Sequence, residues 1–243
     1  MYYLLRKQII LLVLTVIFCT LKSFGQREIY RTYHDDLSYY FGITLGYNSS
    51  FLQATKSSKF LQDDSVLSAE PGANSGIAMG LHATVNLSKR FQLRFNPQLI
   101  LGGSRYFTYT LNINKYPSLG NQAEVKEILP TTLLSFPIHI KFNSDRIDNF
   151  RTYILAGVKY DIDLASNSSA RKSDDMIRLK GGDYGVETGI GFNFFLQYVT
   201  ISPEIKFSYG LADIHQRNPA LMFSNVFDKI QSRMIIFSLH FED

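Results

Sequence analysis

Apolar and polar residues alternate along most of the chain after residue 38. The run 39–48 shows the pattern, with Phe41, Ile43, Leu45 and Tyr47 at one parity and Gly42, Thr44, Gly46 and Asn48 at the other. A period of two residues puts alternate side chains on opposite faces and indicates a β-strand. The same alternation predicts eight strands, at 39–48, 76–87, 91–101, 132–142, 150–164, 183–195, 198–211 and 233–241.

The connections between these strands alternate between long and short. The long ones are 49–75, 102–130, 165–182 and 212–231, and the short ones are 88–90, 143–149 and 196–197. Each strand has close to the roughly 9–11 residues that cross a bilayer at a tilt. An even number of such strands, with long loops at one end and short turns at the other, is typical of an outer-membrane barrel. We therefore expect an all-β fold, an eight-stranded antiparallel transmembrane β-barrel.

The polar face of the strands indicates whether the apolar side chains of this barrel point outward to lipid or inward. A soluble lipocalin-like barrel is the alternative, and its apolar face would line the interior. The polar face, however, is rich in glycine and carries charges of both signs. Because glycine weakens a strand unless space is short, this face is predicted to line a crowded lumen. Pro97, Pro137 and Pro203 fall inside predicted strands, where we expect β-bulges.

The N-terminus has the pattern of a secretory signal peptide. Arg6 and Lys7 precede the apolar run 9–18, and small residues lead to a cleavage site after Gly25. The expected domains are the signal peptide 1–25, a short N-terminal periplasmic segment 26–38 and the outer-membrane β-barrel 39–243. The protein is therefore expected to be exported through the periplasm to the cell outer membrane.

Two other readings of the N-terminus remain. An uncleaved anchor would need about 20 apolar residues, and the run 9–18 is short for that. A lipoprotein signal would end at Cys19, but Phe18 stands where lipidation needs a small residue.

Removal of the signal peptide changes the charge and cysteine content. The whole chain has 25 Lys+Arg, 21 Asp+Glu and one cysteine, and residues 1–25 hold three of the basic residues and Cys19. The mature chain is then nearly neutral, with no basic run to bind nucleic acid. It also has no cysteine for disulfides or thiolate catalysis, so a metal site would depend on His and carboxylates.

Tyrosine is abundant, with 15 residues, and several lie near strand ends as expected of girdles at the membrane interfaces. These are Tyr39, Tyr40, Tyr47, Tyr160, Tyr184, Tyr198 and Tyr209.

Side chains with catalytic potential are predicted to face the lumen. They are His82, His139, Ser135, Ser202 and Glu187. A hydrolase would need three of them within hydrogen-bond reach of one another, but no nucleophile motif supports this. We expect these side chains to fill the lumen and to hydrogen-bond there without a catalytic role. The acidic pairs Asp35–Asp36, Asp63–Asp64 and Asp174–Asp175 lie outside the strands and lack the ligand spacing of a calcium loop. We expect no catalytic, cofactor or metal site.

One structural pair in the lumen follows from the last short turn. If 196–197 is a two-residue turn, Glu187 lies opposite Lys206, where the two charges neutralise each other. The same register places Pro203 opposite Ile190, at a non-hydrogen-bonded site, so that its missing donor faces the last strand.

Several runs resemble the PorT family. They are 133–141 (LLSFPIHIK), 157–160 (GVKY), 163–167 (DLASN), 189–192 (GIGF) and 202–211 (SPEIKFSYGL), with shorter matches at 144–146, 149–151, 232–233 and 237–239. The resemblance covers essentially the mature chain and is weak in the long loops. The signal ending at 23–26 (SFGQ) resembles those of the Bacteroidetes. The resemblance implies an outer-membrane barrel needed for the type IX secretion system and, in gliding species, for motility. It supplies no catalytic residues.

We therefore expect a non-enzymatic component or assembly factor of protein secretion. Its expected partners are outer-membrane lipid and other proteins of the secretion machinery, with no cofactor, no nucleic acid and no small-molecule substrate. The first alternative is a lipid-modifying or hydrolytic barrel enzyme, and the second is a generic structural barrel.

Overall fold

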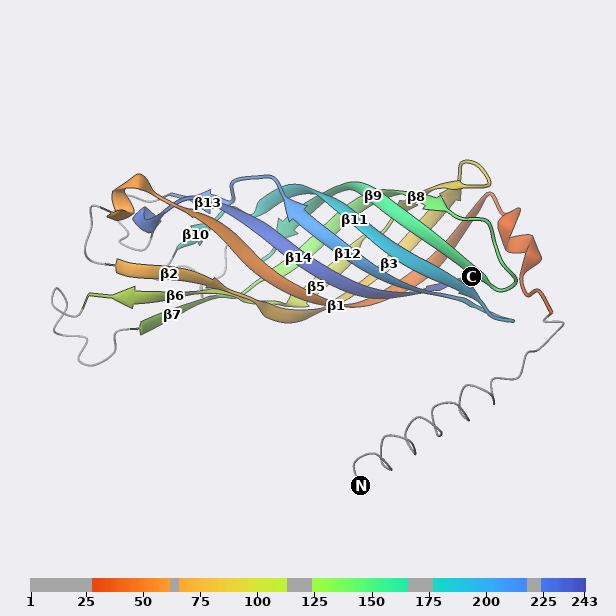
Figure 1. Ribbon diagram of the computed structural model, residues 1–243, viewed down its shortest axis with the longest axis horizontal. Helices are drawn as coiled ribbons and strands as arrows, with labels where there is room; N and C mark the ends of the chain where they lie inside the picture. The colour runs from red at the N-terminus through yellow and green to blue at the C-terminus, as the bar shows by residue number, and fades with distance from the viewer. Residues whose placement is uncertain (1–27, 62–65, 113–123, 166–176, 218–223) are drawn as a thin grey trace, which may run out of the picture.

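The computed structural model describes residues 28–61, 66–112, 124–165, 177–217 and 224–243. Nine strand segments pair antiparallel in a closed ring (Figure 1). They are β1 (Tyr39–Lys56), β3 (Asn74–Asn86), β4 (Phe91–Phe95), β5 (Gln98–Gly102), β8 (Thr132–Asn143), β9 (Phe150–Asp163), β11 (Gly182–Phe195), β12 (Thr200–Gly210) and β14 (Phe227–Glu242). Because β4 and β5 share one place between β3 and β8, the ring has eight positions, which confirms the predicted barrel.

The two ends of the barrel differ. The end with the short turns, called the inner end here, also holds the C-terminus and the segment that leads into β1 (Figure 1). The opposite, outer end holds the long connections. Among the described residues, no helix is long and apolar enough to cross a membrane.

The predicted strand 91–101 is interrupted at Pro97. The β4–β8 register ends at the pair Phe95↔Ile138, and the β5–β8 register resumes at Gln98↔Ser135. The register is the same on both sides of this gap, so no β-bulge forms here and that prediction is wrong. Pro97 lacks the N–H that would continue the ladder, and the gap also takes in Pro137, whose carbonyl accepts from the N–H of Asn96 at 3.2 Å.

The hairpin of β11 and β12 corrects the predicted register. Phe195 pairs with Thr200, and the N–H of Leu196 donates to the Val199 carbonyl at 3.0 Å. The turn therefore has four residues, 196–199, and the pairing is shifted by two positions from the prediction. Since the shift is even, every side chain keeps its predicted face.

The shift changes which residues lie opposite each other. Glu187 pairs with Ser208, and Lys206 pairs with Gly189. Ile190 pairs with Ile205, so the predicted pairing of Ile190 with Pro203 is wrong. The β12–β14 ladder continues through Pro203↔Leu239, whereas the pairing of β12 with β11 is interrupted beside Pro203. The missing donor therefore faces β11 and not the last strand.

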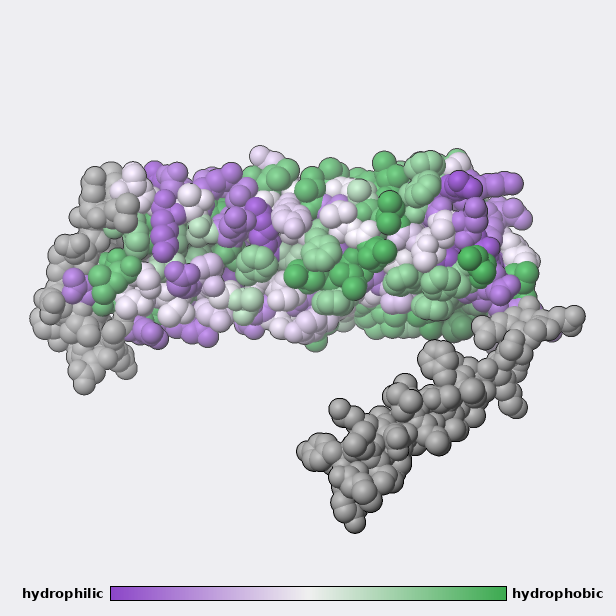
Figure 2. Space-filling model, viewed as in Figure 1, coloured by the Kyte–Doolittle hydropathy of each residue, from purple (hydrophilic) through white to green (hydrophobic). Residues whose placement is uncertain are grey.

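The outward positions of the barrel strands are mostly apolar, and the inward ones are mostly polar, as predicted. Figure 2 shows the apolar residues along the barrel wall, with hydrophilic residues gathering toward its two ends. Exposed tyrosines mark both edges of this wall, with Tyr39 and Tyr198 near the inner end and Tyr47, Tyr160, Tyr184 and Tyr209 toward the outer end. Tyr40 was expected in the girdle but is buried, because it faces the lumen and donates to Gln92 Oε1 at 3.2 Å.

The long connections contain strands that the alternation did not predict. One sheet consists of β2 (Val66–Gly72), β6 (Arg105–Leu111) and β7 (Glu124–Leu129), and a second pairs β10 (Arg178–Leu179) with β13 (His215–Gln216). With the outer parts of β1 and β14 they form an outer extension beyond the membrane-facing wall (Figure 1). Its interior is an apolar core of Leu52, Val66, Ala69, Phe107, Tyr109, Leu111, Leu129, Ile177, Leu179, Ile214, Val226, Phe227 and Ile230.

The segment before β1 closes the inner end. Residues 32–35 form a 3-10 helix, η1 (Thr32–Asp35), and Arg31 is almost fully buried. Arg31 Nη1 donates to the carbonyl of Glu242 at 3.0 Å, and Asn149 donates to the Glu28 carbonyl at 2.8 Å. The predicted signal peptide lies outside the described residues.

Gly157 shows why the lumen-facing side of the strands needs glycine. It lies in β9 between His139 of β8 and Glu187 of β11, whose side chains hydrogen-bond at 2.8 Å. A Cβ at Gly157 would lie 2.0 Å from the Ile138 carbonyl oxygen and 2.9 Å from the His139 ring.

We expect Gly157→Ala to destabilise the barrel by about 1–3 kcal/mol, because the added methyl group overpacks a site bounded by backbone. The measurement is urea unfolding in detergent, followed by the shift between folded and unfolded bands on a gel. Gly182→Ala is the control, since its added Cβ would meet only the hydroxyl end of Tyr160, at 3.0 Å. Equal midpoints for both variants would contradict the prediction.

Candidate functional site

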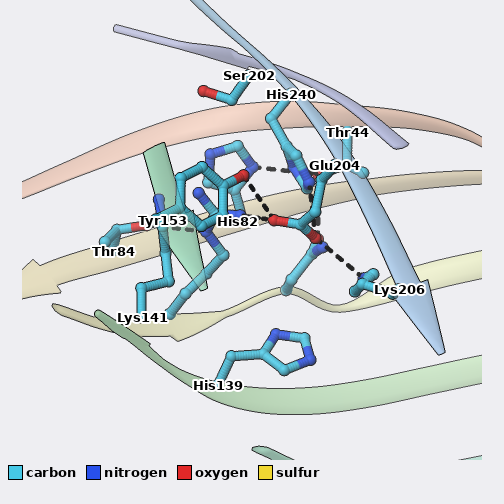
Figure 3. A network of polar contacts seen from close by, with 12 residues as sticks. Thr44, His82, Thr84, His139, Lys141, Tyr153, Ser202, Glu204, Lys206 and His240 are labelled. Atoms are coloured by element: carbon cyan, nitrogen blue, oxygen red, sulfur yellow. Dashed lines mark hydrogen bonds and ion pairs between the residues drawn. The ribbon is translucent and has the colours of Figure 1, made fainter. Parts of the chain in front are cut away.

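A connected network of charged side chains lies buried in the inner half of the lumen. Figure 3 shows part of it from close by. Arg94 of β4 lies at the centre of the network with no exposed side-chain surface. Its Nη1 donates to Glu204 Oε2 at 3.0 Å, and its Nη2 donates to Glu242 Oε1 at 2.6 Å. One guanidinium thereby joins carboxylates from β12 and β14 across the barrel.

Glu204 collects donors from several strands. The hydroxyl of Tyr153 in β9 donates to its Oε2 at 2.7 Å. His240 Nε2 and Lys206 Nζ lie 3.3 and 3.7 Å from its Oε1. A carboxylate buried without such partners would carry a large desolvation cost.

Two histidines extend the network toward β1 and β3. Thr44 Oγ1 lies 3.1 Å from His82 Nδ1 and 2.9 Å from His240 Nδ1, and the two rings meet edge to face. Lys141 lies on the other side, with its ammonium 4.0 Å from Glu242 Oε1 and 4.0 Å from the centre of the Tyr153 ring.

The predicted pair Glu187 and Lys206 lies within this network. Lys206 Nζ is 3.8 Å from Glu187 Oε2 and 3.7 Å from Glu204 Oε1, so it stands between two carboxylates. His139 Nε2 lies closer to Glu187, at 2.8 Å. The two residues reach each other diagonally, since Gly189 and not Glu187 is opposite Lys206.

The residues considered for hydrolysis do not form a catalytic group. Ser135 donates to Asp161 at 2.5 Å and Ser202 to Asn193 at 3.0 Å, whereas His139 contacts Glu187. Neither serine hydroxyl forms a hydrogen bond with a histidine side chain in the part of the chain that the structure describes. All these side chains are buried, so a substrate in water or lipid would not reach them.

The structure describes only one of the three acidic pairs that the sequence analysis considered for calcium binding. Asp35 accepts from Arg151 Nη2 at 2.6 Å and from Arg146 Nη1 at 3.3 Å, and so fixes η1 at the inner end. The pairs at 63–64 and 174–175 lie outside the described residues. Within the described ranges, no cluster of three His, Asp or Glu residues could hold a metal ion.

The sequence did not indicate the polar contacts of the outer extension. His215 Nε2 lies 3.0 Å from Ser224 Oγ, but Ser224 is fully buried. Glu127 of β7 lies in the apolar core, where its Oε1 accepts from the N–H of Ile177 at 2.6 Å. Burial raises the pKa of Glu127 to about 7, against smaller opposing effects of its contacts with Ile177 and Tyr109.

The first prediction from this site concerns the buried charges. We expect Lys206→Met to cost about 3–5 kcal/mol, because it leaves two buried carboxylates short of a cation. The double variant Lys206→Met with Glu187→Gln should cost less, since one of these carboxylates is then neutral. Urea midpoints of the folded band on gels compare the two, and an equal or larger loss in the double variant would refute the expectation.

The second prediction concerns Glu127. Its folded-state pKa lies above the ordinary value of 4.5, so the folded extension holds a proton that the opened chain releases. Stability of the extension should fall from pH 5 to 7, with opening increasing up to about tenfold per pH unit. Hydrogen-exchange protection factors of β7 and Ile177 measure this, and Glu127→Gln should remove the pH dependence. An unchanged slope in that variant would contradict the assignment.

Comparison with known proteins agrees with this architecture. Residues 30–216 match the family model described as "Outer membrane protein beta-barrel domain". No protein with a curated description matches the chain.

The chain is also similar to several solved structures. OprG of Pseudomonas aeruginosa is 15% identical with a TM-score of 0.44, over 84% of this chain and 93% of its own. Neisserial surface protein A is 13% identical with a TM-score of 0.40, over 82% and 95%. The outer-membrane protease OmpT of Escherichia coli is 10% identical with a TM-score of 0.43, over 84% and 95%. Because the family model spans most of the chain, the protein belongs to the outer membrane protein beta-barrel domain family and resides in the outer membrane.

Proposed function

We propose that this barrel is a non-enzymatic component or assembly factor of protein secretion, and specifically of a type IX secretion system. The observation that carries the proposal is the filled lumen. Arg94, Lys141, Lys206, Glu204 and Glu242 are all buried and tied to one another across the barrel. A barrel of eight strands has room for side chains and little else, so transport through this one is not its role.

The surfaces outside the bilayer are then the parts available for function. The outer extension has its own apolar core, and the inner end is closed by the segment before β1. Both are folded surfaces of the kind that can contact other proteins. The resemblance to the PorT family supports secretion as the process, and gliding motility would follow in a species that glides.

The enzymatic alternative has a candidate nucleophile among the described residues of the outer extension. Ser224 is within hydrogen-bond distance of His215, as a nucleophile and its base would be. Its complete burial argues against attack on a substrate. We therefore assign this pair to packing of the outer extension.

Deletion of the gene tests the proposal. Secreted cargo should accumulate in the periplasm while the outer membrane stays intact. The reason is that the deletion removes a component of the secretion machinery and leaves the permeability barrier in place. The measurements are cargo fractionation and exclusion of a small periplasm-impermeant dye. A complementing Ser224→Ala variant should restore export fully.

Two outcomes would contradict the proposal. Normal cargo export in the deletion strain would remove the secretion role, and a permeability defect alone would favour a structural barrel. Failure of Ser224→Ala to restore export, with the folded protein present in the outer membrane, would favour an enzyme.

A further inference from the structure

The outward face of β14 changes from apolar to polar at one point along the strand. Toward the inner end it presents Phe241, Leu239, Phe237 and Ile235, and beyond them Arg233, Gln231 and Lys229. The facing positions of β1 become polar one pair further out, since Phe51 pairs with Arg233, Gln53 with Gln231 and Thr55 with Lys229. This part of the barrel wall therefore passes from the hydrocarbon region of the membrane into the headgroup region near Arg233.

Arg233 is held at that level by its surroundings. Its guanidinium lies 5.1 Å from the ring centre of Tyr209, its cross-strand neighbour in β12 and a member of the outer girdle. Nη1 donates to the carbonyls of Gly210 at 2.8 Å and Ser232 at 2.9 Å. An arginine facing lipid costs about 2–4 kcal/mol at the bilayer midplane and about 0–1 near an interface, so this position corresponds to the headgroup region.

The positive charge at this level has no neutralising partner in the described part of the chain. Among the described residues, no carboxylate forms an ion pair with Arg233 or Lys229. The acidic residue next to Lys229 is Asp228, and it is already paired with Arg217. Arginines of the inner end differ, since Arg90 is paired with Asp145 and Arg146 with Asp35.

We propose that Arg233 and Lys229 bind the headgroup of a phosphorylated glycolipid in the outer leaflet, with a phosphate on Arg233. The guanidinium has donors beyond Nη1, namely Nε and an Nη2 that makes a long hydrogen bond, of 3.4 Å, to Gln231. A guanidinium offers phosphate a planar pair of donors, and an ammonium adds a point charge.

The neighbouring side chains fit the rest of such a lipid. Gln53, Thr55 and Gln231 offer polar groups beside the two cations, at the level of headgroup sugars. Phe237 and Ile235 lie immediately inside, where acyl chains would pack. The site thus recognises a lipid with an anionic headgroup at the outer surface, and it goes beyond the proposed role in secretion.

The test is lipid retention by the full-length mature barrel. Purified protein is exchanged into detergent containing lipopolysaccharide, the same lipopolysaccharide after phosphatase treatment, or neither, and native mass spectrometry counts bound glycolipid. We expect Arg233→Gln with Lys229→Gln to weaken binding of the phosphorylated form by about tenfold or more, equivalent to about 1.4 kcal/mol. The dephosphorylated form should bind the unaltered protein as weakly as the phosphorylated form binds the double variant.

Control variants separate this site from general electrostatics and from misfolding. Arg90→Gln removes one charge at the inner end from a residue that already has a carboxylate partner, and it should bind as the unaltered protein does. Arg233→Lys should retain part of the affinity. The folded band on gels must match in all variants, and if the double variant does not fold, Lys229→Gln alone should still weaken binding.

Three results would overturn the proposal. The first is that the unaltered protein and the Lys229→Gln or double variant retain equal amounts of phosphorylated glycolipid. The second is that the unaltered protein retains the dephosphorylated form as well as the phosphorylated one. The third is that millimolar inorganic phosphate displaces the lipid entirely. The last result would indicate a site for the free anion and not for a lipid.

Discussion

Closure of eight strands into a ring puts nearly every buried charge of this protein into one narrow space. Polar side chains cannot face lipid, so they turn inward, where water is scarce and each charge needs a partner. Arg94 meets this requirement for Glu204 and Glu242 at once, at 3.0 and 2.6 Å. The network across the lumen is thus a consequence of closure, and it also ties together strands that are not neighbours.

The interior changes its chemistry along the barrel axis. The inner half is charged, and toward the outer end a small apolar cluster of Ala78, Ile100, Leu133, Met234 and Ile236 lies beside the buried charges of Asp161, Asp163 and Asp183. The outer extension then has a core like that of a water-soluble protein. This order follows from the solvent outside, because lipid accepts apolar side chains on the wall, whereas water drives them inward. Met234 and Ile236, which break the alternation of the last strand, belong to the small apolar cluster near the outer extension.

These two interiors bear on function in different ways. The charged lumen makes the membrane part a rigid, closed support, while Glu127 leaves a titratable contact in the core of the outer extension. The inner end is fixed through Arg31, Asp35 and Arg146. A barrel built in this way presents two folded surfaces, one on each side of the membrane, and that arrangement suits a protein that works by contact.

Alternation alone determined the eight barrel strands, the face each side chain takes and the long and short ends, because a strand's period is local and its two faces see different solvents. Glu187 and Lys206 could be placed in the lumen for the same reason. The register of their hairpin could not, because a four-residue turn at 196–199 carries no strong sequence signal and a shift of two residues leaves the pattern intact. Arg94, Glu204 and Glu242 are brought together only by ring closure, and the strands of the outer extension form only where distant segments share a core. Contacts of this kind depend on three-dimensional proximity, which the tertiary structure alone decides.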